Sequence, residues 1–318
     1  MMRKESDGQL KDEYIKMDGI RNECFNELEV HKHGKHRSWS KRVVARLASA
    51  FVFGMVLLTG CGHSVNVPDM SSMGTINAIS REEGSGTKAE FDNLVGTDAS
   101  GTNNVAASTD DVISKVSEDK NAIGYLAYSA ADGSKVKLLK VDGVAPDETS
   151  IEKDKYPLCR DYILVYNGEL SPVAQDFLAY IKSAGQSVVA KHCVPVKDAA
   201  TFLTDKSNGT VTVHGSTSAA PILSDLASEY MKLNPNAKVE VTESDSTQGL
   251  NDAMQGKCDL GMSSRSLQSY EKELLTSYVF GRDAIAVVVN SENPMDDISV
   301  DMLKKIYDKE YTEWTDIK

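Results

Sequence analysis

The sequence has few of the residues that mark metal centres, redox sites and common catalytic motifs. It contains five cysteines in 318 residues, and no two of them stand in a CxxC spacing, so neither a zinc motif nor a redox motif is indicated. Neither G-x-x-x-x-G-K-[ST] nor G-x-S-x-G occurs, which argues against a P-loop and against the nucleophile elbow of an α/β-hydrolase. We therefore expect no metal, no cofactor and no enzymatic activity.

Positive charge is scarce beyond the first sixty residues. Residues 1–60 hold 11 of the 35 Lys/Arg and 8 of the 47 Asp/Glu, so the rest of the chain carries 24 basic and 39 acidic residues, a net charge of −15. Such a surface repels nucleic acid and acidic membranes, and we expect no nucleic-acid partner. Any bound anion must then be held by local backbone dipoles and a few placed cations. A length of 318 residues with 41% hydrophobic residues is enough for two domains.

The N-terminal region lacks an apolar run of comfortable membrane-spanning length. Its apolar stretch, LASAFVFGMVLL, has twelve residues, follows three basic residues and ends in Leu58-Thr59-Gly60-Cys61. This pattern is typical of a signal peptide and resembles a bacterial lipobox, in which Cys61 becomes the lipidated first residue. A buried helix or an uncleaved anchor is the alternative. We expect an N-terminal extension and lipoprotein signal peptide over 1–60, then a tether over 61–73.

From residue 75 onward, strand-like and helix-like segments alternate. Strands are predicted at TINAIS, RDYILVYN, VTVHG, KVEVTE and AIAVVVN, and a single helix is predicted over 171–192 with Pro172 in its first turn. Strands that alternate with helices predict an α/β fold with mainly parallel sheets.

Small hydroxyl residues recur where a strand gives way to a helix. The stretches are SREEGSGTK (80–88), GSTS (215–218), SDST (244–247) and MSSR (262–265). In open α/β sheets, ligands bind beyond the C-terminal ends of strands, where helix N-termini offer free N–H groups to oxyanions. Ser and Thr also cap helices everywhere, so one such junction alone is weak evidence. Four similar junctions favour an anion site. His214 could instead act as a base toward Ser216 or Ser218, but no acidic partner can be assigned from the sequence.

Several segments resemble those of one known family. SREEGSGT, AIGYLAYSA, KVDGVAP, YPLCRDYILVYNGELSPVAQDFLAYI, GTVTVHGSTSAAPI, CDLGMSSR, DAIAVVVN and EWTDIK are similar to segments of the phosphate-binding protein of phosphate ABC transporters (PstS-like). The resemblance covers nearly all of residues 74–318. It implies a two-lobed, periplasmic-binding-protein-like (type II) fold with inorganic phosphate in the cleft. Together with the lipobox-like pattern at Cys61, the resemblance leads us to expect a lipid-anchored protein on the extracytoplasmic face that serves ABC permease and ATPase subunits. A protein that keeps the fold but senses phosphate or binds a partner, without transport, is the alternative.

The order of these segments differs from the family pattern, in which GSTS comes before SREEGSGT. Here the part over 74–196 precedes the part over 210–318, which resembles a circular permutation joined at 197–209. The alternative is a piece of a tandem array, with halves of two modules. The family pattern implies one lobe over 74–155 plus 285–318 and another over 156–284, with crossovers near Tyr156 and Asp283 as the hinge. It also implies that EWTDIK lies near TINAIS.

The resemblance assigns a set of phosphate-binding residues to these junctions. Some family members have Asp where this chain has Ser264, and a carboxylate there would accept a hydrogen bond from protonated phosphate but repel sulfate. Asp245 either supplies that acceptor or is merely a helix cap, and Arg265 either adds a cation or forms a surface ion pair. Cys159 and Cys193 either pair or remain free thiols. The expected phosphate-binding residues are Arg81, Ser85, Gly86, Thr87, Ser216, Thr217, Ser218, Asp245, Ser246 and Ser264.

Overall fold

In the computed structural model, residues 63–318 form one compact unit. The structure describes residues 65–97, 103–131 and 133–318. The predicted signal peptide, the lipidation site at Cys61 and the start of the predicted tether lie outside these residues. Within the described ranges, no helix combines the length and the apolar character needed to cross a membrane.

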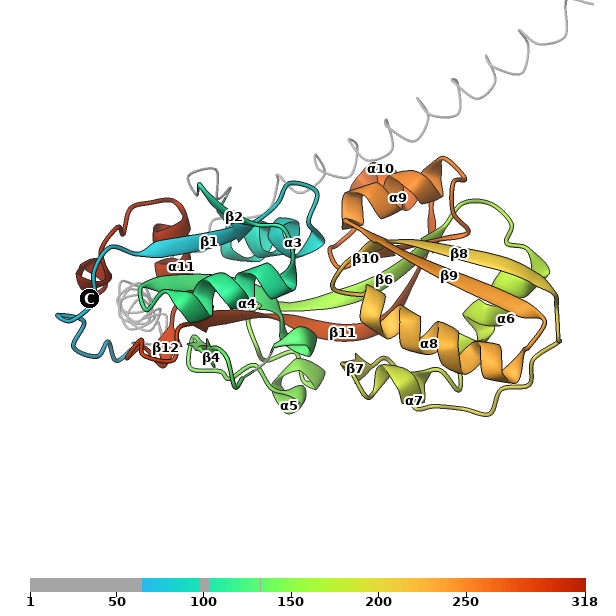
Figure 1. Cartoon of the computed structure of the whole chain (residues 1–318), viewed down its shortest axis with the longest axis horizontal. Helices are drawn as coiled ribbons and strands as arrows, with labels where there is room; N and C mark the ends of the chain where they lie inside the picture. Colours follow the sequence, from blue (N-terminus) through green and yellow to red (C-terminus); the bar gives the residue numbers. More distant parts are fainter. Residues whose placement is uncertain (1–64, 98–102, 132) are drawn as a thin grey trace, which may run out of the picture. The chain divides into compact units, whose positions relative to one another are not determined.

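A ten-stranded mixed sheet organises this unit (Figure 1). Along its main path the strands follow the order β2-β1-β3-β11-β6-β10-β8-β9, and β4 and β7 both pair with β11. The bounds of these strands are Asn77–Arg81 (β1), Asn104–Ala106 (β2), Ala122–Ala127 (β3), Lys137–Leu138 (β4), Cys159–Tyr166 (β6), Val194–Pro195 (β7), Gly209–Ser216 (β8), Ala237–Ser244 (β9), Leu260–Ser263 (β10) and Thr276–Val289 (β11). A second, two-stranded sheet pairs β5 (Lys140–Val141) with β12 (Asp297–Ile298).

Helices connect the strands of both sheets. The α-helices are α3 (Gly86–Val95), α4 (Thr109–Glu118), α5 (Glu148–Glu152), α6 (Pro172–Ile181), α7 (Gln186–Val189), α8 (Ala220–Leu233), α9 (Ser246–Met254), α10 (Ser269–Leu274) and α11 (Val300–Tyr307). Two short 3₁₀ segments cover Tyr128–Ala130 (η1) and Trp314–Asp316 (η2). Several helices begin at a side-chain cap, as the sequence pattern suggests: Ser108, Ser171 and Ser299 each accept a backbone N–H from the first turn.

The sheet is parallel at its two ends and antiparallel in its middle. Strand β1 pairs in parallel with β2 and β3, and β8 pairs in parallel with β9 and β10. Between these groups, β11 runs antiparallel to both β3 and β6, and β6 runs antiparallel to β10. The expected α/β architecture is present, but the two middle strands depart from the mainly parallel arrangement that the sequence suggested.

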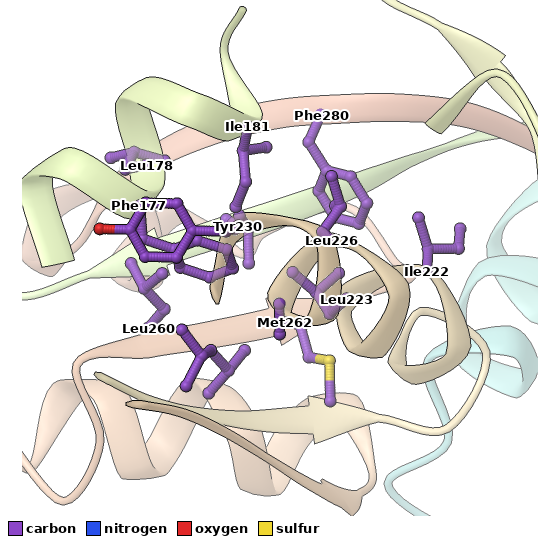
Figure 2. Packing of buried hydrophobic residues seen from close by; sticks show 14 of the residues in the cluster. Phe177, Leu178, Ile181, Ile222, Leu223, Leu226, Tyr230, Leu260, Met262 and Phe280 are labelled. Atoms are coloured by element: carbon purple, nitrogen blue, oxygen red, sulfur yellow. The ribbon is translucent and has the colours of Figure 1, made fainter. Parts of the chain in front are cut away.

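Buried side chains separate into two lobes. We use "central lobe" for the elements from β6 to α10, whose largest core is formed by residues such as Phe177, Tyr230 and Met262 (Figure 2). We use "terminal lobe" for the elements from β1 to α5 together with β12, α11 and η2, whose cores include Phe91, Ile123 and other buried residues. The aromatic rings of Phe91 and Tyr125 stack with their centroids 3.9 Å apart. Hydrophobic burial thus stabilises each lobe around its own part of the sheet.

The predicted helix over 171–192 is in fact two helices, α6 and α7. The helix stops at Lys182, and the chain resumes a helical path at Gln186. Gly185 lies in this break, where a Cβ atom would fall 2.9 Å from the Leu226 side chain on α8 and 2.9 Å from the Ile181 Cα. The close approach explains why glycine stands in the break, because any side chain there would collide with Leu226 of α8 and with the end of α6.

The two ends of the described chain meet in the terminal lobe. Thr75 forms an antiparallel bridge with Glu313, and the backbone N–H of Trp314 donates to the carbonyl of Gly74 at 3.1 Å. The expectation that EWTDIK lies near TINAIS is therefore confirmed. Part of the predicted tether also packs against this lobe, since Met70 is only 4% exposed and belongs to the core there.

Candidate anion-binding site

The four hydroxyl-rich junctions follow strands β1, β8, β9 and β10. Strands β8, β9 and β10 are parallel neighbours, so their C-terminal ends lie along the same edge of the sheet. Helix α3, which follows β1 from the terminal lobe, brings its N-terminus to this edge. Gly86, the first residue of α3, lies so close that a Cβ atom there would be 2.1 Å from the Oγ of Ser246 and 2.6 Å from the Oγ of Ser264. Junctions from both lobes therefore converge.

The hydroxyls of GSTS do not cap the helix that follows them. Helix α8 has Ala219 as its N-cap residue, with no hydrogen bond from that side chain to the first turn. The Oγ of Ser216 instead bonds to the Oγ of Ser264 at 2.9 Å, and the Oγ of Ser218 lies 3.1 Å from the Oγ1 of Thr87. The ordinary capping explanation thus fails at this junction, because its hydroxyls face other loops.

Ser264 is the centre of a buried hydroxyl cluster. Its side chain contacts that of Ser216 at 2.9 Å and that of Ser246 at 3.4 Å, and its backbone N–H donates to the Oγ of Ser246 at 3.1 Å. All three serines are at most 2% exposed. Burying several hydroxyls that bond mainly to one another costs free energy, because they lose their hydrogen bonds to water. Hydrogen bonds from these hydroxyls to an oxyanion would recover that free energy, and such bonds are strong in a buried site.

Arg81 is the cation at the C-terminal end of β1. It is 1% exposed, and its guanidinium forms two hydrogen bonds to Glu82, at 2.8 and 2.9 Å. Longer contacts reach the hydroxyls of Thr109 at 3.5 Å and Thr217 at 3.4 Å. Arg81 therefore spans the two lobes and holds a positive charge next to the hydroxyl cluster, with only weak neutral partners on that side.

A second buried arginine, Arg160, stands on β6. Its Nη1 donates to the Oγ1 of Thr87 at 2.8 Å, and its Nη2 forms an ion pair with Asp283 at 3.0 Å. Burial lowers the pKa of Arg160, but Tyr162 and Asp283 together raise it above its usual value, so the side chain is charged. Neither Arg160 nor Asp283 is among the site residues expected from the sequence.

Ser85 and Asp245 do act as helix caps. The Oγ of Ser85 accepts from the backbone N–H of Lys88 at 3.4 Å at the start of α3, and the Oδ1 of Asp245 accepts from that of Gln248 at 2.8 Å at the start of α9. The carboxylate of Asp245 also packs against Gly84, where a Cβ atom would be 2.7 Å away. The cap interpretation of Asp245 therefore holds, and its role as an acceptor for protonated phosphate stays a prediction.

Comparison with known proteins identifies the family. The model of the PBP superfamily domain matches residues 33–184 and 200–317. The phosphate-binding protein PstS 2 of Streptococcus agalactiae serotype V is 34% identical over 291 residues, which cover 87% of this chain and 98% of the relative. The chain belongs to the PstS family. PstS 2 of Streptococcus pneumoniae serotype 4 is likewise 34% identical, over 84% of this chain and 94% of its own length.

A similar solved structure supports the same fold. The phosphate-binding protein of a phosphate ABC transporter from Streptococcus pneumoniae TIGR4 superimposes with a TM-score of 0.66 at 34% identity, covering 77% of this chain and all of the other. The fold of this PstS-family chain is thus the periplasmic-binding-protein-like type II fold that the sequence predicted. PstS of Bacillus subtilis aligns over only 127 residues, 42% of its length, at 31% identity. These comparisons do not show a circular permutation.

Two further residues of this PstS-family protein have roles that differ from the alternatives considered. Arg265 forms a buried ion pair with Glu271 at 2.8 Å, so it neither adds a cation to the hydroxyl cluster nor lies on the surface. His214 is hydrogen-bonded through Nδ1 to Asp252 at 3.0 Å, while Ser216 bonds to Ser264. The base-and-nucleophile pair considered for His214 is therefore not formed with Ser216.

The cysteines in the described part of the chain are free thiols. Cys159 is partly buried and Cys193 is buried, and neither forms a disulfide. Burial raises the pKa of the Cys159 thiol to about 11, with the Asp154 carboxylate adding to the effect. The thiol is thus uncharged near neutral pH, which lowers its reactivity.

The sequence signal for Arg160 was present but ambiguous. An arginine at the start of the apolar run YILVY is unusual for a strand that becomes buried. Its partner Asp283 lies 123 residues further along the chain. Without the fold, nothing connects the two residues or places them beside Thr87.

Proposed function

We propose that this PstS-family protein binds inorganic phosphate between its two lobes, as a lipid-anchored extracytoplasmic protein, and delivers it to an ABC permease and its ATPase. The names of the streptococcal relatives and of the similar solved structure support phosphate as the ligand. The observation that carries the proposal is the buried cluster of Ser216, Ser246 and Ser264 in the central lobe. The start of α3 and the guanidinium of Arg81, both from the terminal lobe, lie beside this cluster.

The arrangement suits a tetrahedral oxyanion for a physical reason. Helix N-termini of α3, α8 and α9 carry partial positive charge, and their first N–H groups have no partner within the helix. Hydroxyls of Thr87, Thr217 and Ser218 can add donors, and Arg81 adds a charged one. In a water-excluded site these bonds are stronger than at a surface. Local donors thus bind an anion in spite of the acidic surface of the protein.

Calorimetry tests the binding directly. The full chain is titrated with phosphate and, separately, with sulfate, and we expect saturable heat with phosphate. We expect Arg81→Ala to weaken phosphate binding at least about tenfold, because charge-assisted hydrogen bonds are the strong ones. A folded wild-type chain that releases no heat with phosphate would refute the proposed function. Wild-type affinity in the Arg81→Ala variant would refute the role of Arg81.

Delivery and anchoring need a cellular measurement. Uptake of labelled phosphate is compared in cells that produce the wild-type chain or a Cys61→Ala variant. We expect the variant to leave the membrane fraction and uptake to fall, because lipidation at Cys61 is proposed to retain the protein near its permease. Uptake that is independent of the wild-type protein would favour a sensing or partner-binding role.

The circular permutation stays a proposal about segment order. The alignment with the streptococcal relatives is nearly complete, which supports the same segment order in those proteins and in this chain. A permuted segment order would limit the alignment with other family members to part of each chain, and the alignment with PstS of Bacillus subtilis is limited in this way. We expect the chain to be a monomer by light scattering. A dimer formed by exchange of halves would favour the tandem alternative.

A further inference from the structure

Arg160 touches both lobes at the edge of the hydroxyl cluster. It lies at the second position of β6, is 4% exposed, and contacts Thr87 of the terminal lobe and the carbonyl of Ser264 in the central lobe, at 2.8 and 3.3 Å. We propose that Arg160 is a positioning residue for phosphate, which acts through the hydroxyl of Thr87 and does not bind the anion itself. This inference rests on the proposed function.

Arg160 has no N–H group to spare for an anion. Its Nη1 donates to Thr87 and to the Ser264 carbonyl, its Nε donates to Asp283, and its Nη2 donates to Asp283 and to the hydroxyl of Tyr162. A guanidinium has five N–H groups, and these contacts engage all five. Arg81 differs, because it makes only four hydrogen bonds and so has one N–H group without a partner in these contacts. Two of its four hydrogen bonds are long contacts to threonine hydroxyls.

The charge of Arg160 is neutralised behind the site. Asp283 is fully buried, pairs with the guanidinium at 3.0 Å, accepts from the Tyr162 hydroxyl at 2.7 Å and accepts from the backbone N–H of Ser129 at 3.0 Å. An arginine fixed by so many contacts has one geometry. The contact to Thr87 is therefore set by the fold before any ligand arrives.

The effect of this contact falls on the Thr87 hydroxyl. Because the Oγ1 of Thr87 accepts from Arg160, its hydrogen is free to point toward the Oγ of Ser218, 3.1 Å away, or toward an anion. A positive charge beside the oxygen also polarises the O–H bond and makes it a stronger donor. Arg160 thus orients Thr87 as a donor, at the N-terminus of α3 where the anion is proposed to bind.

A double-mutant cycle tests whether Arg160 acts through Thr87. Removing Arg160 alone would leave Asp283 buried and unpaired, so the charges are removed together in Arg160→Gln/Asp283→Asn. Phosphate dissociation constants of the full chain are measured by calorimetry for wild type, Arg160→Gln/Asp283→Asn, Thr87→Val and the triple variant. Arg282→Gln/Asp161→Asn is the matched control, because it neutralises a partly exposed ion pair on the same two strands.

We expect the paired change and Thr87→Val each to weaken phosphate binding about tenfold, and the triple variant to bind within about twofold of Thr87→Val. The control should match wild type. A purely structural role of Arg160 predicts instead that the two effects multiply, to about a hundredfold, and that result overturns the inference. Wild-type phosphate affinity in Arg160→Gln/Asp283→Asn also overturns the inference about Arg160. The proposed function is tested separately, by whether the wild-type chain binds phosphate.

A second variant covers the case in which the paired change prevents folding. Arg160→Lys keeps a charge for Asp283 but offers three N–H groups in place of five. We expect it to weaken phosphate binding when Thr87 is present and to have no further effect in the Thr87→Val background. An equal loss in both backgrounds overturns the inference. Absence of phosphate binding in wild type overturns the proposed function and this inference together.

Discussion

Gly86 lies where the two lobes approach each other closely. The methyl group of Gly86→Ala would be placed 2.1 Å from the Oγ of Ser246, well inside contact distance. We expect this variant to keep its fold, since Gly86 opens a helix, but to lose most phosphate binding because the hydroxyl cluster must move apart. Calorimetry of the variant measures the loss. Gly133→Ala, where a Cβ would meet nothing within 4 Å, is the control, and unchanged binding by Gly86→Ala would contradict the proposed site.

At the residue scale, the sequence predicted which side chains gather but not how they pair. Ser216, Ser246 and Ser264 were all expected from their positions after strands, and the structure brings them together. The pairing of Arg160 with Asp283 was out of reach, because it joins residues far apart in the chain and depends on the register of β6 against β11. Local patterns identify helix starts, whereas ion pairs between strands require the tertiary fold.

A buried ion pair fixes helix α10 to the preceding loop. Glu271 is 1% exposed and accepts from both terminal nitrogens of Arg265 at 2.8 Å and from the Gln268 backbone N–H. Burial raises the pKa of Glu271, but the hydrogen bonds from Arg265 and Gln268 outweigh this and lower it below its usual value. The ionised carboxylate is therefore the form that stabilises the fold.

This lowered pKa predicts how stability varies with pH. The contribution of Glu271 is complete above the pKa of an unfolded glutamate, about 4.3, and is lost as the pH falls through the lower folded pKa. Glu271→Gln should cost about 3 kcal/mol in the free energy of unfolding at pH 7, because it leaves Arg265 buried without its charge partner. The gap to wild type should narrow below about pH 4. Urea denaturation across this range measures it, with the exposed Glu273→Gln as control; a gap that is constant with pH would contradict the assignment.

Helix α3 also carries a contact between the lobes outside the hydroxyl cluster. The carboxylate of Glu90 accepts from the backbone N–H of Ser266 at 2.7 Å and from its Oγ at 3.1 Å. Glu90→Ala should weaken phosphate binding several-fold without touching the anion, because it removes bonds that exist only while the lobes are together. Calorimetry gives the affinity, and Glu83→Ala, whose side chain is 93% exposed, is the control. Equal affinity in Glu90→Ala and wild type would show that this contact does not favour closure.

Element lengths were harder to predict than element types. The sequence indicated a strand at 284–290, whereas β11 begins at Thr276. The first part of the strand was missed because residues such as Ser277 and Arg282 give no apolar signal. These polar residues can extend the strand since β6 pairs with it along most of this part. Tertiary pairing, more than local propensity, sets the length of a strand.

At the scale of the whole molecule, Trp314 holds the chain ends together. Its side chain is fully buried in the terminal lobe, and its Nε1 donates to the carbonyl of Asn121 at 3.0 Å. Trp314→Ala should reduce the free energy of unfolding by about 3–5 kcal/mol, because it removes a large buried side chain. Urea denaturation measures this loss. Leu203→Ala, at a position 89% exposed, should change stability little, and a similar small effect of Trp314→Ala would contradict the packing described.

Strand β11 links the two lobes in one further respect. Phe280 belongs to the core of the central lobe, while Ile285 and Val288 belong to the two cores of the terminal lobe, and one unbroken strand contains all three. None of these cores can be completed while this strand is unpaired. Loss of structure in one lobe therefore withdraws support from the other, and heat or denaturant should unfold the protein as a single cooperative unit although each lobe has its own cores.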